Sequence, residues 1–159
     1  MVIASMPTAL DLARRKSQAV VGAGGHTQLM SSRLAVVVID AHDPEAVAAF
    51  WCEVLGWSIV DREEDGLAIG PAGGAWPRID VFKVPEAKTV KNRLHFDLRA
   101  EDRSTAEELH RLETLGARRV DVGQSPEDTW VVLADPEGNE FCLLQRSLDD
   151  LPESERPSS

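Results

Sequence analysis

The stretch RLAVVVIDAHDPEAVAAFWCEVLGW, from Arg33 to Trp57, decides the fold of this chain. It opens with a run of β-branched residues that is typical of a buried strand. A helix is predicted next, because Asp43 is a favourable N-cap, Pro44 suits the first helical position and Gly56 suits the C-cap. A strand that leads directly into an amphipathic helix is half of a supersecondary unit, and the residues that follow complete it.

Three further strands are predicted after this helix, and the same order of elements then begins again. The strands of the first unit are expected at residues 33–40, 57–62, 66–72 and 78–84, and its helix at 43–56. Those of the second unit are expected at residues 93–100, 117–122, 129–135 and 140–145, and its helix at 104–116. The sequence therefore predicts a βαβββ unit that occurs twice.

Two pairs of dipeptides support a duplication, because both repeat after 60 residues. They are Arg33-Leu34 with Arg93-Leu94, and Leu55-Gly56 with Leu115-Gly116. A duplicated unit buries a face that a single unit leaves open. We therefore predict an α+β fold in which two βαβββ units, at about 33–88 and 92–147, form a half-barrel cleft.

Both ends of the chain are expected to lie outside this fold. Residues 1–32 are predicted to be an N-terminal extension, partly helical or flexible. The folded domain is expected to cover residues 33–147. Residues 148–159 are polar and contain proline, which predicts a flexible C-terminal tail.

The composition excludes several classes of partner. The net charge is −10, and so acidic a surface repels phosphate, which argues against binding of nucleic acid. No stretch approaches the length of a bilayer span, so no membrane role is expected. Cys52 and Cys142 are the only cysteines and are too few for a disulfide framework. We therefore expect reduced thiols in a cytoplasmic protein.

The strand predicted at residues 93–100 has two chemically different faces. Its apolar members are Leu94, Phe96 and Leu98, and its polar members are His95, Asp97 and Arg99. If the helix covers the apolar face, the polar face lines the cleft; the alternative is a polar face in contact with solvent. Inside a cleft, Asp97 or Arg99 could orient the imidazole of His95 or bind a charged substrate group. A carboxylate beside the ring would make His95 a usable acid or base near neutral pH.

Three stretches of the sequence carry a family pattern. They are DPEAVAAFWCEVLGW at 43–57, KNRLHFDLRAED at 91–102, and LADPEGNEFCLLQ at 133–145 with its Asp-Pro-x-Gly-Asn turn. Together they resemble the vicinal oxygen chelate superfamily of glyoxalases, bleomycin-resistance proteins and dioxygenases, and within it the glyoxalase-like branch. The resemblance implies a fold more specifically than an activity, because the superfamily spans several enzyme classes and drug-sequestering proteins.

The resemblance also implies where a metal would be held. In the metal enzymes of the superfamily, four strand residues, usually His and Glu, hold a divalent ion on the cleft floor. Two of these positions correspond to His95 and Cys142, and Asp80 is the candidate for a third. The fourth corresponds to Ala35 by the repeat offset, or to Val36 by counting back from the helix, and neither can ligate. A three-ligand site with a thiol would suit zinc, nickel or iron. The alternative for Cys142 is a place in the core.

Large aromatic side chains are candidates for binding a ligand. They are Trp57, Trp76, Trp130 and Phe82. Two such rings at the mouth of a cleft would clamp a flat apolar compound. The alternative is that these rings pack at the ends of strands.

These observations leave two functions open, and with them the question of whether the protein is an enzyme. One is a glyoxalase-like lyase or isomerase that acts on a small oxygenated substrate, with His95 as metal ligand or acid/base. The other is a metal-free protein that sequesters an apolar or aromatic compound, as bleomycin-resistance proteins do. A third hypothesis is a dimeric module that serves a partner protein. The resemblance implies a homodimer and a small-molecule ligand.

Overall fold

The computed structural model of this chain describes residues 34–74, 77–125 and 127–156. The N-terminal extension expected at residues 1–32 lies outside the described residues. None of the helices described is long and apolar enough to cross a lipid bilayer.

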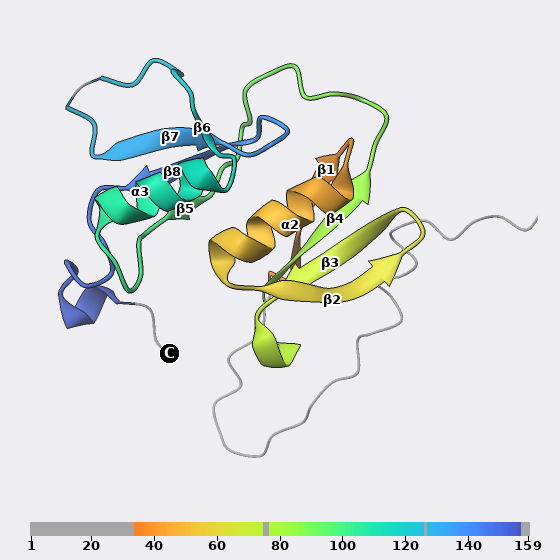
Figure 1. The fold of residues 1–159 in the computed structure, drawn as a ribbon, viewed down its shortest axis with the longest axis horizontal. Coiled ribbons are helices and arrows are strands. Elements are labelled where there is room, and N and C mark those ends of the chain that lie inside the picture. Colours follow the sequence, from red (N-terminus) through yellow and green to blue (C-terminus); the bar gives the residue numbers. More distant parts are fainter. Residues whose placement is uncertain (1–33, 75–76, 126, 157–159) are drawn as a thin grey trace, which may run out of the picture. The chain divides into compact units, whose positions relative to one another are not determined.

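The described residues form two βαβββ units, as the sequence predicts (Figure 1). The first consists of β1 (Val36–Ala41), α2 (Pro44–Leu55), β2 (Ser58–Glu63), β3 (Gly66–Gly70), the short 3-10 turn η2 (Ala72–Gly74) and β4 (Arg78–Lys83). The second consists of β5 (Asp97–Leu98), α3 (Thr105–Thr114), β6 (Arg118–Arg119), β7 (Trp130–Ala134) and β8 (Glu140–Leu144), and the 3-10 turn η3 (Glu153–Glu155) follows it. The predicted α+β class is therefore confirmed.

The two sheets have the same topology. Their strand orders are β1-β4-β3-β2 and β5-β8-β7-β6. In each sheet the first strand pairs in parallel with the last strand of its unit, and the remaining pairs are antiparallel. The shared topology supports the duplication inferred from the dipeptides. Both sheets are open, as the strands of a half-barrel cleft would be.

Both helices begin at residues that suit an N-cap, and α2 also ends at a residue that suits a C-cap. The carboxylate of Asp43 accepts a hydrogen bond from the backbone N–H of Ala46 (3.2 Å), and Gly56 ends α2 with a φ of 65°. At α3 the hydroxyl of Ser104 accepts from the backbone of Glu107, whose carboxylate accepts from the backbone of Ser104. This capping box satisfies two backbone donors at once. The bonds from Ser104 lower the pKa of the Glu107 carboxyl.

Replacing Ser104 with alanine is expected to lower the free energy of unfolding by about 1 kcal/mol, because an N-terminal backbone donor of α3 loses its partner. Urea unfolding of the variant and the parent protein measures this difference. Ser58→Ala, at an exposed strand position, is the matched control and should change stability by a few tenths of a kcal/mol at most. Equal losses in the two variants would contradict the capping role.

The two units share one hydrophobic core, centred on Trp51 of α2. Its side chain is 1% exposed, and its ring makes edge contacts with Phe50, Phe96 and Phe141 at centroid distances of 5.2–5.4 Å. Phe96 and Phe141 belong to the second unit, so the ring links the units. The inward residues of both sheets complete the core, among them Ile69, Val81, Leu133 and Leu143.

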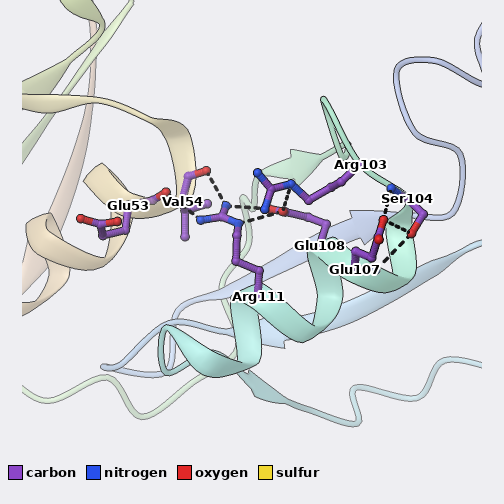
Figure 2. Close-up of polar contacts among 7 residues, drawn as sticks. All are labelled: Glu53, Val54, Arg103, Ser104, Glu107, Glu108 and Arg111. Carbon is purple, nitrogen blue, oxygen red and sulfur yellow. Dashed lines mark hydrogen bonds and ion pairs between the residues drawn. The ribbon is translucent and has the colours of Figure 1, made fainter.

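A polar network joins α3 to the end of α2 (Figure 2). The guanidinium of Arg111 donates to the carbonyls of Glu53 (3.0 Å) and Val54 (3.1 Å) in the last turn of α2, where carbonyls lack partners within the helix. The carboxylate of Glu108 accepts from Arg111 (2.7 Å) and lies 3.4 Å from Nε of Arg103. The network fixes how the helices of the two units meet.

Two strands of the second unit are shorter than predicted, and one expected burial is wrong. β5 covers only Asp97–Leu98, although the backbone N–H of Cys142 also donates to the carbonyl of Phe96 (2.8 Å). Leu94 precedes this pairing and is 88% exposed, so α3 does not cover it. β6 covers only Arg118–Arg119, and the backbone N–H groups of Val122 and Gly123 just beyond it donate to side chains of their own loop; such local bonds compete with a strand.

Residues 148–156, which the sequence analysis assigns to a flexible tail, make defined contacts. The backbone N–H of Leu148 donates to the carbonyl of Ala100 (2.8 Å), and Leu151 is buried. The sequence pattern does not predict these contacts, because one buried leucine, Leu151, does not make the apolar periodicity by which a helix or strand is recognised.

Candidate functional site

The candidate site lies on one face of the second sheet. Successive residues of a strand point to opposite faces, and residues paired across strands point to the same face. Phe96, Phe141 and Leu143 face the shared core. The opposite face, which we call the outer face, therefore carries Asp97 and Cys142, which pair in register.

Three side chains with metal-binding donors converge on this outer face. They are His95, Asp97 and Cys142, and their donor atoms all lie within 4.8 Å of one another. His95 precedes Asp97 by two residues and therefore lies on the same side of the extended chain. Its Nε2 lies 3.3 Å from Oδ1 of Asp97. The side chains of His95 and Asp97 are 42% and 52% exposed, whereas Cys142 is buried.

The environment of Cys142 keeps its thiol protonated in the metal-free protein. Burial raises the pKa of the thiol to about 11, and the negative charge of Asp97 and a hydrogen bond to it act in the same direction. The thiolate is the reactive form of cysteine. Cys142 should therefore be unreactive at neutral pH unless a cation is present beside it.

Alkylation of Cys142 by iodoacetamide at pH 8 is expected to be slower than in the unfolded chain by roughly a hundredfold, because the raised pKa lowers the thiolate fraction by that factor. The rate should increase about tenfold for each pH unit between 8 and 10, whereas the unfolded chain should level off above its ordinary pKa. Mass spectrometry of the Cys142 peptide measures both rates. A native rate that levels off near pH 9 would contradict the raised pKa.

Asp80 lies away from these three residues. It belongs to β4 of the first sheet, where its Oδ1 lies 3.1 Å from Nε of Arg78. Among the described residues, the carboxylate that lies close enough to share a metal ion with His95 and Cys142 is that of Asp97, and not that of Asp80. Of the predicted set of His95, Asp80 and Cys142, the structure thus brings together His95 and Cys142, with Asp97 beside them.

The other residues singled out in the sequence are dispersed. Arg99 donates to the carbonyl of Arg146 (2.7 Å), in the segment after β8. Trp57 packs against the shared core, and Phe82 lies half-buried in β4 beside Asp80. Trp76 lies outside the described residues.

Trp130 is the predicted aromatic residue that shares the outer face with the three donors. It pairs with Leu144, two residues beyond Cys142, and is 40% exposed. The alternation along β7 and β8 places Trp130, Leu144 and Cys142 on the same face. An exposed ring thus lies on the same surface as a polar cluster.

The first sheet has a corresponding face with other side chains, among them Val38 and its partner Asp80. Ala41 and Ala100 hold corresponding positions. Both are buried, and the carbonyl of each accepts a hydrogen bond from the segment after its parallel partner strand. These two alanines are 59 residues apart. Val36, and not Ala35, is therefore the counterpart of His95.

The remaining counterparts follow from the pairing of strands. Val38 pairs with Asp80 in the first sheet as Asp97 pairs with Cys142 in the second. Two valines thus stand where the second unit has an imidazole and a carboxylate. The donor set is confined to the second unit.

Two cavities in the described part of the chain lie elsewhere. A cavity of about 400 Å³ lies between the start of α2 and the β2–β3 turn. Its lining residues are His42, Asp43, Pro44, Glu45, Glu63, Glu64, Asp65, Gly66, Leu67 and Lys83. A second, of about 10 Å³, has room for at most about one water beside Arg78 and Asp80. His95 lines neither cavity, and its side chain is 42% exposed in the described part of the chain.

Comparison with known proteins places this geometry in context. The model of the glyoxalase-like domain family matches residues 36–144. No curated protein matches the chain significantly.

Solved structures with this fold share little sequence with the chain. A glyoxalase/bleomycin resistance/dioxygenase family enzyme from Burkholderia phytofirmans has a TM-score of 0.54 and 20% identity, over 70% of this chain and 97% of its own. TnmS3, an antibiotic-binding protein from Streptomyces, has a TM-score of 0.52 and 21% identity, over 74% of this chain and 99% of its own. The third is the fosfomycin resistance protein FosX from Listeria monocytogenes, in complex with Mn(II) and a dihydroxypropylphosphonic acid. It has a TM-score of 0.55 and 14% identity, over 77% of this chain and 95% of its own.

Proposed function

Since the chain belongs to the glyoxalase-like domain family, we propose that it binds a small oxygenated organic ligand on the outer face of its second sheet. The observation that supports this most is the convergence of His95, Asp97 and Cys142 on one face that also carries Trp130. A few convergent polar groups beside an exposed aromatic ring are typical of small-molecule sites. The polar groups would orient the oxygens of the ligand, and the ring would cover its apolar part.

We further propose that a second copy of the chain closes the cleft. The three donors lie on an exposed face, and β1 and β5 are edge strands of their sheets. Leu34, Val38 and Leu94, on or beside these edges, are exposed. Exposed edges with apolar side chains favour association with another chain. In such a homodimer, the outer face of the first sheet of one protomer would lie over the outer face of the second sheet of its partner.

The chemistry favoured for such a site is that of a lyase or isomerase. Asp97 lies beside Nε2 of His95 and would hold the ring in one orientation, which leaves Nδ1 as the nitrogen able to take or give a proton. A divalent ion held by the same residues, such as zinc, nickel or iron, would polarise a substrate oxygen instead. Cys52 and Cys142 are free thiols, which suits a reducing compartment such as the cytoplasm.

The second candidate function is sequestration of an apolar or aromatic compound without a metal. Val36 and Val38 favour it, because they add apolar side chains to the corresponding face of the first sheet, beside Arg78 and Asp80 with which they pair. The similarity of fold to an antibiotic-binding protein agrees with it.

Equilibrium binding distinguishes these functions. Tryptophan fluorescence and calorimetry would be recorded with α-hydroxy acids, 1,2-diketones and flat aromatic drugs as probes. If the ligand is oxygenated, His95→Ala should abolish binding of the first two classes and His110→Ala, on the exposed face of α3, should not. If the protein sequesters drugs, Trp130→Ala should weaken binding of the aromatic compounds and His95→Ala should have little effect. If neither His95→Ala nor Trp130→Ala changed the binding of any probe, a site on the outer face would be contradicted.

A further inference from the structure

We propose that His95, Asp97 and Cys142 form a mononuclear site for a thiophilic divalent ion such as zinc, complete within the second unit of a single chain. This inference rests on the proposed function in that it assigns the ion and its ligands at the same site. Its test needs no organic ligand, because the three donors come from β5, the residues just before it, and β8.

The pairing of strands places the donors where a single ion could reach them all. Asp97 and Cys142 are directly opposite each other in a parallel pair, and His95 lies two residues before Asp97. In a tetrahedral zinc site with bonds of about 2.0–2.3 Å, neighbouring donor atoms are about 3.3–3.8 Å apart. The separation of 3.3 Å between His95 Nε2 and Asp97 Oδ1 already has this value. All three donors lie within 4.8 Å, so small side-chain rotations would complete the geometry.

The types of donor atom select among metals. A nitrogen, a carboxylate oxygen and a sulfur form a borderline-soft set, which suits zinc and disfavours magnesium and manganese. The thiolate and the carboxylate together would carry two negative charges, which balance a divalent ion. Three protein ligands leave a fourth position open, which is the arrangement of catalytic rather than structural zinc sites.

The site differs from the pattern expected from the resemblance. That pattern has four ligands on the cleft floor, whereas Val36 and Val38 occupy the counterparts of His95 and Asp97 in the first unit. The first sheet therefore has no imidazole or carboxylate at these positions. A carboxylate adjacent to the histidine, at Asp97, takes the place of the distant Asp80.

The alternative to a metal site is a solvated ion pair between His95 and Asp97 beside a thiol that packs as an apolar side chain. This alternative predicts no preference for thiophilic ions. It also predicts that the thiol is not required for binding any ion.

The test uses the full chain, purified without a histidine tag and treated with a chelator, in the absence of organic ligand. Cobalt(II) should bind with one ion per chain and produce a thiolate-to-cobalt charge-transfer band together with the visible bands of tetrahedral cobalt. Zinc should displace it, and magnesium should not. His95→Ala and Cys142→Ser should each weaken zinc binding by about a hundredfold or more, and Asp97→Asn should weaken it as well.

Two variants serve as matched controls. Cys52→Ser removes the other thiol, and Asp80→Asn removes the carboxylate that lies away from the site; both should keep the charge-transfer band and the affinity. Circular dichroism of each variant shows that it is folded. A charge-transfer band that survives in Cys142→Ser, or the absence of stoichiometric cobalt and zinc binding, would overturn the proposal. Organic-ligand binding is measured separately, so either proposal can fail without the other.

Discussion

Replacing Asp135 with alanine is expected to lower the free energy of unfolding by about 3–4 kcal/mol. The carboxylate of Asp135 is fully buried at the end of β7. It accepts hydrogen bonds from the backbone of Glu137 (3.0 Å) and from the backbone (2.8 Å) and side chain (3.0 Å) of Asn139. The indole N–H of Trp51 lies 3.4 Å from its second oxygen. Alanine would leave these donors without a partner in a half-buried turn.

The loss should extend beyond the turn itself. The carboxylate of Glu137 accepts from the backbone N–H groups of His42 and Asp43, just before α2. The Asp-Pro-x-Gly-Asn turn of the second unit therefore holds the start of the helix of the first unit. Urea unfolding measures the effect, with Asp149→Ala at an exposed position as the control. A loss below about 1 kcal/mol for Asp135→Ala would contradict this account of the turn.

Trp51→Ala is expected to cost about 4 kcal/mol of stability, because a large buried aromatic side chain leaves a cavity that its neighbours fill only in part. The ring contacts Phe50 in its own helix and Phe96 and Phe141 in the second unit. Its removal should therefore weaken the contact between the units as well as each unit. Thermal and urea unfolding measure the total change.

A matched control separates burial from aromatic character. Trp130→Ala removes an indole that is 40% exposed on the outer face, so its cost should be about half that of Trp51→Ala. Similar losses for the two variants would contradict the central position of Trp51. A two-step unfolding curve for Trp51→Ala would show that the ring is what makes the two units unfold together.

Local chemistry explains why much of this fold could be predicted from the sequence. Asp43, Pro44 and Gly56 determine the ends of α2 through their own backbone preferences. The alternation of apolar and polar residues in β7 and β8 identifies which side chains face the core. The order of elements then repeats, so one unit predicts the other.

The composition of the site could be predicted only in part, because it depends on contacts between distant segments. His95 and Cys142 were singled out by the resemblance, but the pairing of Asp97 with Cys142 depends on the register of two strands that are 45 residues apart. The bond from Arg99 to the carbonyl of Arg146 depends on the path of the chain after β8. A strand pattern indicates which face a residue occupies, but not which residue lies opposite.

The most direct test of the central claim is a crystal structure of the zinc-loaded chain with anomalous data recorded on both sides of the zinc absorption edge. We expect one anomalous peak on the outer face of the second sheet, at about 2.0–2.3 Å from a ring nitrogen of His95, an oxygen of Asp97 and the sulfur of Cys142. A zinc peak bound to other residues, with the Cys142 sulfur in apolar contacts alone, would contradict it.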